Sequence, residues 1–242
     1  MKMLSIILPT YNEEKNIEHT VTSIAEYCGA KQYPYEIIII DDGSTDGTYR
    51  LACILGEKNN SVSILQHETN RGKGAAVRTG MAVANGEILI FLDADGSTKI
   101  SELDVCVPFL SQGYGVVIGS RYMEQSMVVR KQPPARIMIG RLGNMLIRFL
   151  LLPGIVDTQC GFKVFTKHGA HEIFSRQTIE GWGFDMEILV IARLLGLRIK
   201  ELPVSWYDAT NRASRFRPIK DICRTFAELL LIKTNILLGR YR

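Results

Sequence analysis

The chain has 242 residues with 46% hydrophobic content, which is enough for one large buried core, so one domain with an appended C-terminal segment is expected. Its five cysteines are scattered and form no CxxC pair, so neither a disulfide framework nor a zinc site is indicated, and a reducing cytosolic location fits. The first nine residues lack the apolar length of a signal peptide and lead directly into a predicted strand.

The net charge of +4 is unevenly distributed along the chain. Residues 1–110 carry 9 Lys/Arg and 15 Asp/Glu, a net charge of −6, whereas residues 111–242 carry 20 and 10, a net charge of +10. The basic half indicates an anionic partner, either phosphate groups or a membrane surface. No DNA- or RNA-binding motif is visible, and a nucleic-acid partner is not expected.

The first half of the chain alternates short apolar runs with helical segments. Apolar runs of this length are typical of buried parallel strands. Strands are expected over 4–8, 37–40, 62–65, 88–92 and 116–118, and helices over 12–27, 46–55, 72–84 and 101–110, the first of these capped by Asn12. This order predicts an α/β fold with a mainly parallel, Rossmann-like sheet, right-handed crossovers and helices on both faces.

The second half is less regular. An apolar helix punctuated by arginines is expected over 136–152, a loop and strand over 157–165, a helix over 184–195, a strand over 199–204 and a long amphipathic helix over 218–238. No segment is long and apolar enough for a confident transmembrane span. We therefore expect one domain over 1–217 and a C-terminal amphipathic helix over 218–242 that lies in a membrane interface, with core packing or an oligomer contact as the alternative.

Two acidic loops follow two of the predicted strands. Asp41 and Asp42 end the second strand, and Asp93-Ala94-Asp95 ends the fourth. Ligands of open α/β sheets bind beyond the carboxyl ends of the strands. An Asp-x-Asp pair suits Mg²⁺ or Mn²⁺ held by carboxylates together with substrate phosphates, with Ser97 as a further ligand. The sequence thus predicts a nucleotide-diphosphate site, although Asp-rich turns alone are the simpler interpretation.

Other residues of the same crevice have weaker signals. Pro9, Tyr11 and Glu13 follow the first strand and would line the nucleotide site, with Tyr11 as packing the alternative. Lys73 lies in a Gly-rich helix start that lacks the Ser or Thr of a phosphate loop. We expect Lys73 near the nucleotide, and the sequence leaves open whether it contacts the nucleotide directly.

Three further groups are candidates for the chemistry. Arg121 follows the fifth strand on the ligand side of the sheet and suits bidentate phosphate binding. Asp185 and Glu187 lie in the first turn of a predicted helix, where they stabilise the helix dipole or reach toward the sugar or metal. The polar loop over 206–218 carries several arginines, among them Arg215, and could close over phosphates.

Taken together, these motifs resemble the family 2 glycosyltransferases of the GT-A fold, over nearly the whole chain. The segments that carry the resemblance are Pro9-Thr10-Tyr11-Asn12-Glu13, Asp41-Asp42-Gly43-Ser44, Asp93-Ala94-Asp95 and Gly119-Ser120-Arg121-Tyr122. Within that family, the stretches at 157–165, 183–187 and 201–204 resemble the polyprenyl-phosphate sugar synthases, and the dolichyl-phosphate β-glucosyltransferases more than the mannose synthases.

The resemblance implies roles for individual residues. Asp93 and Asp95 would hold a metal–diphosphate, the first-strand motif would bind the nucleobase, and Arg121 and Arg136 would meet the acceptor phosphate. Two positions depart from the family pattern: Ser214-Arg215 replaces Ser-Lys, and Gly140 replaces a serine that often follows the arginine here at 136.

The function expected from these features is inverting transfer of a hexose, with glucose from UDP-glucose preferred, to a dolichyl or other polyprenyl phosphate. Arg215 would help to stabilise the departing diphosphate. Mannosyl transfer from GDP-mannose, nucleotidyl transfer and a non-catalytic nucleotide-sugar-binding protein are the alternatives. We expect a cytoplasmic protein bound peripherally to the cytoplasmic face of a membrane, with homo-oligomer formation left open.

Overall fold

The computed structural model of the chain describes residues 2–128, 147–207 and 218–242, the side chains of 128 and 218–224 excepted. Within these residues, seven strands form one sheet in the order β3-β2-β1-β4-β7-β5-β8, and β6 pairs with β9 in a small second sheet. The strands are β1 (Leu4–Thr10), β2 (Tyr35–Asp41), β3 (Val62–Gln66), β4 (Ile88–Leu92), β5 (Val116–Ser120), β6 (Met127–Val128), β7 (Phe162–Thr166), β8 (Ile199–Pro203) and β9 (Ser205–Trp206).

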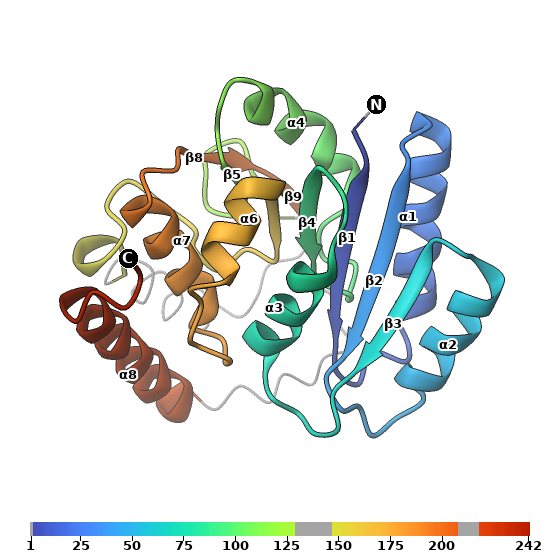
Figure 1. Ribbon diagram of the computed structural model, residues 1–242, viewed down its shortest axis with the longest axis horizontal. Coiled ribbons are helices and arrows are strands. Elements are labelled where there is room, and N and C mark those ends of the chain that lie inside the picture. The colour runs from blue at the N-terminus through green and yellow to red at the C-terminus, as the bar shows by residue number, and fades with distance from the viewer. Residues whose placement is uncertain (1, 129–146, 208–217) are drawn as a thin grey trace.

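Helices cover both faces of the large sheet, as the sequence predicts (Figure 1). One face packs against α1, α2 and α4, and the other against α3, α6, α7 and the C-terminal helix α8. The bounds of the helices are α1 (Ile17–Lys31), α2 (Thr48–Lys58), α3 (Lys73–Val83), α4 (Leu103–Ser111), α6 (Lys167–Phe174), α7 (Phe184–Leu194) and α8 (Pro218–Leu237).

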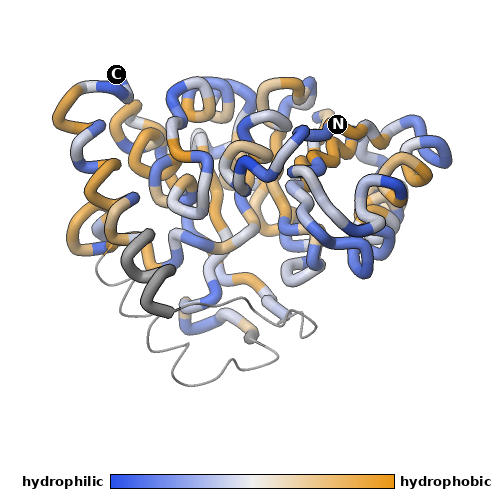
Figure 2. Tube along the Cα trace, turned by 90° about the horizontal axis from the view of Figure 1, so that it is seen from below, coloured by the Kyte–Doolittle hydropathy of each residue, from blue (hydrophilic) through white to orange (hydrophobic). Residues whose placement is uncertain are grey.

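Alternation of side chains along the strands explains why their sequences are continuously apolar. Ile6 and Ile39 point into the core under α1, whereas their neighbours Ile7 and Ile38 point into the core under α3, and all four are buried. Figure 2 shows these apolar strands enclosed between the helical layers. Full burial of such a side chain stabilises the fold by roughly 1.5–3 kcal/mol, so both faces are needed to hold the sheet.

The sheet is parallel except for β7, which is antiparallel to both β4 and β5. The mainly parallel α/β architecture predicted from the sequence is therefore confirmed. The strand order brings β1, β2 and β4 side by side with their carboxyl ends at the same edge. Because β7 runs the other way, its preceding loop also reaches that edge, and Asp93 N–H donates to the Gly161 carbonyl at 3.0 Å.

Two predicted helix starts are wrong. The first helix begins at Ile17, because Asn12 has the left-handed φ of 57° and its side-chain oxygen accepts from Thr45 N–H instead of capping a helix. Ser101 lies in a 3₁₀ turn, and the α-helix begins only at Leu103.

The C-terminal segment packs against the main core. Leu229, Ile232 and Tyr241 of this segment are buried with the side chains of α7. The Tyr241 hydroxyl donates to Glu187 Oε1 at 2.7 Å, which ties the chain end to α7. Within the described residues, no helix combines the length and apolar character that a membrane span requires.

Candidate functional site at the carboxyl edge of the sheet

The carboxyl ends of β1, β2 and β4 bring the predicted nucleotide-binding residues to one edge. Thr10 and Asp41 are register partners at the ends of β1 and β2, and Asp42 N–H donates to the Thr10 carbonyl at 2.8 Å. Ile7 pairs with Phe91, two residues before Asp93. The two acidic loops, far apart in sequence, thus follow β2 and β4, the strands on either side of β1, and lie at the edge where ligands of open α/β sheets bind.

Asp41 has a buried carboxylate oxygen without a hydrogen-bond partner. Its Oδ2 accepts from Gln66 Nε2 at 3.1 Å and from Ser44 N–H at 3.3 Å, whereas no described residue donates to Oδ1. A buried acceptor without a partner costs about 1–3 kcal/mol. This oxygen is therefore a ready acceptor for an N–H or O–H group of a ligand such as a nucleobase or ribose.

The carboxylate of the neighbouring Asp42 is instead engaged by the protein. It accepts from the backbone N–H groups of Arg71 at 3.0 Å and Gly72 at 2.8 Å. His67 Nδ1 lies 2.7 Å from Asp42 Oδ1. Asp42 thus fixes the loop that leads into α3, and of the two adjacent carboxylates Asp41 is the one with an oxygen left for a ligand.

Lys73 is the first residue of α3 and reaches the fourth strand. Gly72, with φ of 112°, makes the turn, and Lys73 Nζ lies 2.6 Å from Asp93 Oδ1. Burial alone would lower the pKa of Lys73, but the carboxylates of Asp93, Asp185 and Asp95 outweigh it and hold the pKa above its usual value. Lys73 is therefore a charged lysine at the predicted diphosphate position.

Gly161 packs directly against the Asp93 carboxylate. A Cβ at this position would lie 1.9 Å from Asp93 Oδ2, far inside van der Waals contact. Any residue larger than glycine must displace Asp93. The glycine that precedes β7 is thus part of the site, although its sequence motif alone did not indicate why.

Asp95 and Ser97 form one unit in the loop after β4. Asp95 Oδ1 accepts from Ser97 N–H at 2.9 Å and from the Ser97 hydroxyl at 2.5 Å. The Thr20 hydroxyl donates to the Ala94 carbonyl at 2.8 Å, which anchors the same loop to α1. Ser97 is buried and orients Asp95.

The carboxylates of Asp93 and Asp95 suit a cation whose remaining coordination positions are filled by oxygens of a bound ligand. Among the described residues, no group of three or more His, Cys, Asp or Glu side chains is placed to hold a metal ion. Two carboxylates near phosphate groups nevertheless match the way that Mg²⁺ and Mn²⁺ bind, with few protein oxygens plus substrate oxygens. Asp93 and Asp95 fit such a cation when a diphosphate supplies the remaining ligands.

A buried ion pair that the sequence did not reveal lies beneath these carboxylates. Lys163 Nζ contacts the Asp185 carboxylate and donates to the Cys160 carbonyl at 2.7 Å, and both charged side chains are almost fully buried. Asp185 therefore lies near the predicted site, close enough to influence the charge of Lys73. Its direct partner, however, is Lys163. A lysine inside the apolar run of β7 was the available signal.

Glu187 has a different role from its neighbour Asp185. It accepts from the backbone N–H groups of Thr178 and Ile179 and from the hydroxyl of Tyr241. Its carboxylate thus joins α7, the loop before it and the C-terminus. The structure separates the two acids that the sequence left equivalent.

Arg121 is held by a bidentate ion pair. Its Nε and Nη2 donate to the two oxygens of Asp157 at 2.7 and 2.9 Å, and its backbone N–H donates to the same carboxylate at 3.0 Å. The Asp157 side chain is fully buried, whereas 20% of the Arg121 side chain remains exposed. The guanidinium is thus fixed in orientation with one side open.

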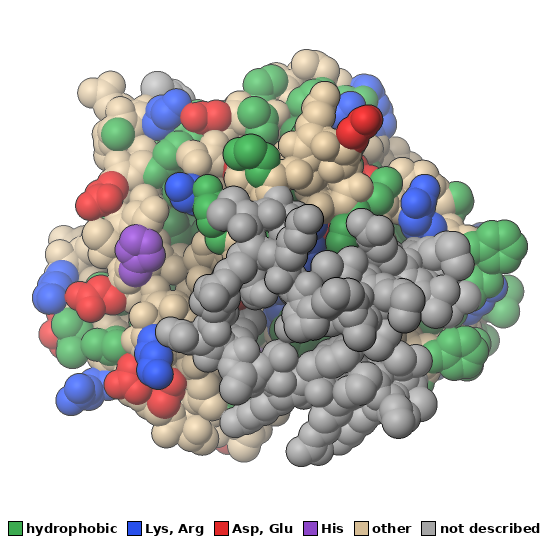
Figure 3. Space-filling view, turned by 180° about the vertical axis from the view of Figure 1, so that it is seen from behind, with side chains coloured by type: hydrophobic (Ala, Val, Ile, Leu, Met, Phe, Trp, Pro, Cys, Tyr) green, Lys and Arg blue, Asp and Glu red, His purple; other side chains and the backbone are tan. Residues whose placement is uncertain are grey.

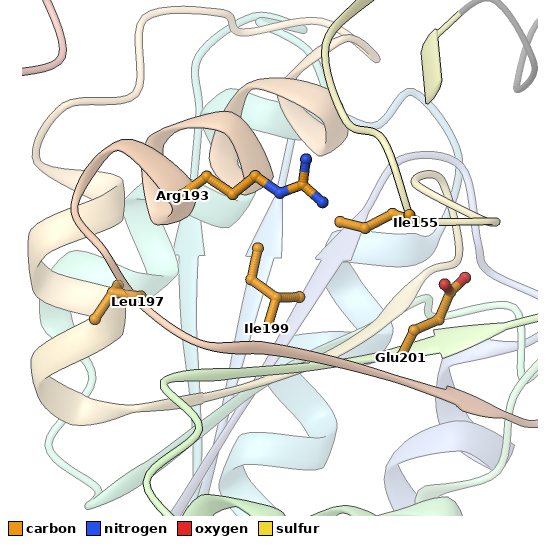
Figure 4. A pocket seen from close by; sticks show the side chains of 6 residues that line it. Ile155, Arg193, Leu197, Ile199 and Glu201 are labelled. Carbon is orange, nitrogen blue, oxygen red and sulfur yellow. The ribbon is translucent and has the colours of Figure 1, made fainter. Parts of the chain in front are cut away.

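Glu201 holds the backbone of the loop that carries Asp157. Its carboxylate accepts from the backbone N–H groups of Val156 at 2.8 Å and Asp157 at 2.7 Å. Glu201 also lines a pocket of about 190 Å³ with Ile155, Arg193, Leu197 and Ile199 (Figure 4). This pocket lies behind the Asp157 loop and is lined by none of the predicted site residues.

The first-strand residues are placed at the same edge but differ in exposure. Tyr11 is 38% exposed, Pro9 is partly exposed and Glu13 is buried. Glu13 Oε2 accepts from Asn16 Nδ2 at 2.8 Å, which stabilises the start of α1. Two other predicted residues, Arg136 and Arg215, lie outside the described residues.

Comparison with known proteins identifies the family. The model of glycosyl transferase family 2 matches residues 5–174, more than half of the chain. The chain belongs to this family. The matched residues include both acidic loops, Lys73 and Arg121.

Curated relatives are similar over most of their length. The chain is 37% identical over 215 residues to a dolichyl-phosphate beta-glucosyltransferase of Trichomonas vaginalis, covering 85% of this chain and 66% of the relative. It is 33% identical over 255 residues to the dolichyl-phosphate beta-glucosyltransferase of Homo sapiens, covering 100% of this chain and 78% of the relative. The Saccharomyces cerevisiae enzyme of the same name is 32% identical, with 99% and 76% covered.

Solved structures support the GT-A fold. Glucosyl-3-phosphoglycerate synthase from Mycobacterium tuberculosis, in complex with Mn²⁺, UDP and glucosyl-3-phosphoglycerate, has a TM-score of 0.69 to this chain at 22% identity. The alignment covers 99% of this chain and 80% of the synthase. The fold predicted from the sequence is therefore confirmed.

We predict that Asp157→Asn destabilises the protein in a pH-dependent way. Burial would raise the pKa of Asp157, but the Arg121 guanidinium outweighs it and holds the pKa below the usual range. The stabilisation is thus fully present above the unfolded-state pKa of about 3.9 and is lost as pH falls toward the lower folded-state pKa. At pH 7 we expect a loss of about 3 kcal/mol in the free energy of unfolding, measured with urea.

The control is Asp104→Asn, which breaks the exposed ion pair with Lys31. It should cost less than about 1 kcal/mol. The difference in the free energy of unfolding between wild type and Asp157→Asn should become smaller below about pH 4. A difference that stays constant from pH 3 to pH 7 would contradict an ionised Asp157 paired with Arg121.

Proposed function

We propose that this glycosyltransferase transfers glucose, with inversion, from UDP-glucose to a dolichyl or other polyprenyl phosphate. The observation that carries the proposal is the 32–37% identity to curated dolichyl-phosphate beta-glucosyltransferases, over 84–100% of this chain. The glucosyl-transferring structural neighbours, crystallised with Mn²⁺ and UDP-glucose, support a uridine nucleotide as donor. Mannosyl transfer from GDP-mannose is the alternative within the family.

The donor would bind along the edge formed by β1, β2 and β4. The open oxygen of Asp41 suits the N–H group of a uracil base, and the exposed ring of Tyr11 lies at the end of the adjacent strand. Asp93 and Asp95 would hold Mg²⁺ or Mn²⁺, with Ser97 orienting Asp95. A bound divalent cation supplies positive charge that stabilises a departing diphosphate. Lys73 and the backbone of Ala94 complete the donor side.

The acceptor would bind on the side of β5. Arg121 offers a fixed guanidinium that suits a phosphate monoester. Such a phosphate has its second pKa near ~6 and is already anionic at neutral pH, so no strong general base is needed. Asp185, ion-paired with Lys163, would then contribute charge and position instead of removing a proton. Arg136 and Arg215 remain predicted partners of the acceptor phosphate and the departing diphosphate.

Donor and acceptor screening tests this function. We expect labelled glucose from UDP-glucose to appear in an organic-extractable product that depends on polyprenyl phosphate and is released by mild acid. GDP-mannose and UDP-galactose serve as matched donors. Greater transfer from GDP-mannose would favour the mannosyl alternative, and nucleotide binding without turnover of any donor would favour a nucleotide-sugar-binding protein.

We predict that Asp95→Asn keeps the fold but lowers transfer at least ~100-fold, by analogy with the loss of a key transition-state stabiliser. The reason is that the amide removes one charged oxygen from the cation-binding pair, while its remaining oxygen still accepts from Ser97. Measured kcat, Mn²⁺ titration and a melting curve check this. Near-normal kcat that is insensitive to chelator would refute the assignment; Asp104→Asn is the control.

We also propose that the protein works peripherally at the cytoplasmic face of a membrane, where its lipid acceptor resides. Large apolar side chains are exposed on the C-terminal segment: Phe226, Leu230, Leu231 and Leu237 of α8 and Leu238 just after it are 43–87% exposed, and Phe149 is 85% exposed. Figure 2 shows apolar and polar positions alternating along α8, and Figure 3 shows apolar side chains gathered at the edge of the molecule where α8 lies.

We predict that the protein sediments with anionic liposomes at low salt and is only partly released by high salt. Cations near an anionic surface contribute roughly 1 kcal/mol each and are screened, whereas apolar insertion is not. The double substitution Leu237→Gln and Leu238→Gln should remove the salt-resistant part. Val105→Gln, at a position 50% exposed on α4, is the control. Wild-type protein that stays wholly in the supernatant would contradict membrane docking.

A further inference from the structure

We propose that Lys73 is a place-holding cation that neutralises Asp93 until metal and nucleotide bind together, and that it then moves to the diphosphate. The inference rests on the proposed donor site and adds an order of binding. The divalent metal ion binds weakly until the nucleotide diphosphate binds Lys73 in place of Asp93.

The first support is the contact itself. Lys73 Nζ lies 2.6 Å from Asp93 Oδ1, and only 11% of the lysine side chain is exposed. The ammonium therefore occupies one side of a carboxylate that the donor site assigns to the metal. Two cations cannot share this oxygen without strong repulsion, because screening by water is weak at a largely buried position.

The second support is the small number of protein ligands. The described residues provide no group of three or more metal-binding side chains, and one of the two acids of the pair is already engaged by Lys73. A hard divalent cation at such a site needs phosphate oxygens to complete its coordination. The nucleotide would thus supply both missing ligands and a new anionic partner for Lys73.

The third support is the setting of the Lys73 ammonium, which has aromatic rings around it where it contacts Asp93. The aromatic rings of Phe91, Trp182 and Phe184 lie 5.3, 5.4 and 5.9 Å from its Nζ, and Trp182 is 58% exposed. Ring faces stabilise a cation without fixing it to one position.

The consequence is positive coupling between metal and nucleotide beyond their direct contact. Whatever factor UDP adds to the Mn²⁺ affinity, Mn²⁺ must add to the UDP affinity. Removing the Lys73 charge should make Mn²⁺ bind more tightly in the absence of nucleotide, since Asp93 is then free of competition. The same substitution should weaken UDP binding, because the diphosphate loses a cationic partner.

Calorimetric titration and the electron paramagnetic resonance signal of free Mn²⁺ test this on the full chain, without any turnover. Lys73→Met keeps an unbranched side chain, one heavy atom shorter, among the three rings and removes the charge. We expect Mn²⁺ alone to bind at least ~10-fold more tightly to Lys73→Met than to wild type. The gain in Mn²⁺ affinity on adding UDP should be smaller by a similar factor.

Two variants serve as controls, with melting curves to check the fold. Lys73→Arg keeps the positive charge and should keep the weak Mn²⁺ affinity of wild type. Lys31→Met breaks another lysine–aspartate pair, with Asp104 on the surface, and should change nothing.

Each outcome has a distinct meaning. Suppose that folded Lys73→Met binds Mn²⁺ no more tightly than wild type, while UDP still promotes Mn²⁺ binding to wild type. This result overturns the place-holding role and leaves the donor site intact. Failure of wild type to bind Mn²⁺ even with UDP would instead overturn the proposed metal-dependent donor site itself.

Discussion

Mutual repulsion of carboxylates at one edge of the sheet is the constraint on which the rest of the site depends. Asp93, Asp95 and Asp185 converge there, and such a cluster would destabilise the fold unless cations were placed among them. Lys163 neutralises Asp185 from within the core, and Lys73 neutralises Asp93 from the start of α3. The Lys163 side chain is fully buried, whereas 11% of the Lys73 side chain is exposed, and we propose that Lys73 responds to a ligand. The balance of charge therefore stabilises the fold, and in the proposed function the same carboxylates and lysines bind a cation and a diphosphate.

Much of the fold was predictable because strands buried on both faces have simple sequences. The runs at 37–40 and 88–92 are continuously apolar, and each is followed at once by an acidic loop, which located both the sheet and its functional edge. The antiparallel direction of β7 and the late start of α1 were not predictable, because they depend on contacts between distant segments. Asn12 had the chemistry of a helix cap, but a hydrogen bond from Thr45, 33 residues away, decided its conformation.

The site was predictable by residue type but not by partner. The sequence located Asp41 and Asp42 together, and only the backbone N–H groups of Arg71 and Gly72 distinguish the engaged carboxylate from the open one. Likewise, Arg121 could be expected to meet a phosphate, yet its orientation depends on Asp157, 36 residues away. Pair interactions of this kind are absent from any local pattern, because each partner alone is an ordinary charged residue of a loop or strand.

The central claim is that a metal–UDP complex binds at the edge formed by β1, β2 and β4, and a crystal structure with Mn²⁺ and UDP tests it most directly. We expect Mn²⁺ to be coordinated by the Asp93–Asp95 loop and the diphosphate, the uracil to donate to Asp41 and not to Asp42, and the Lys73 ammonium to lie on the diphosphate. Nucleotide bound elsewhere, for example in the pocket beside Glu201, or a uracil remote from Asp41 with no Mn²⁺ at Asp93 and Asp95, would contradict this.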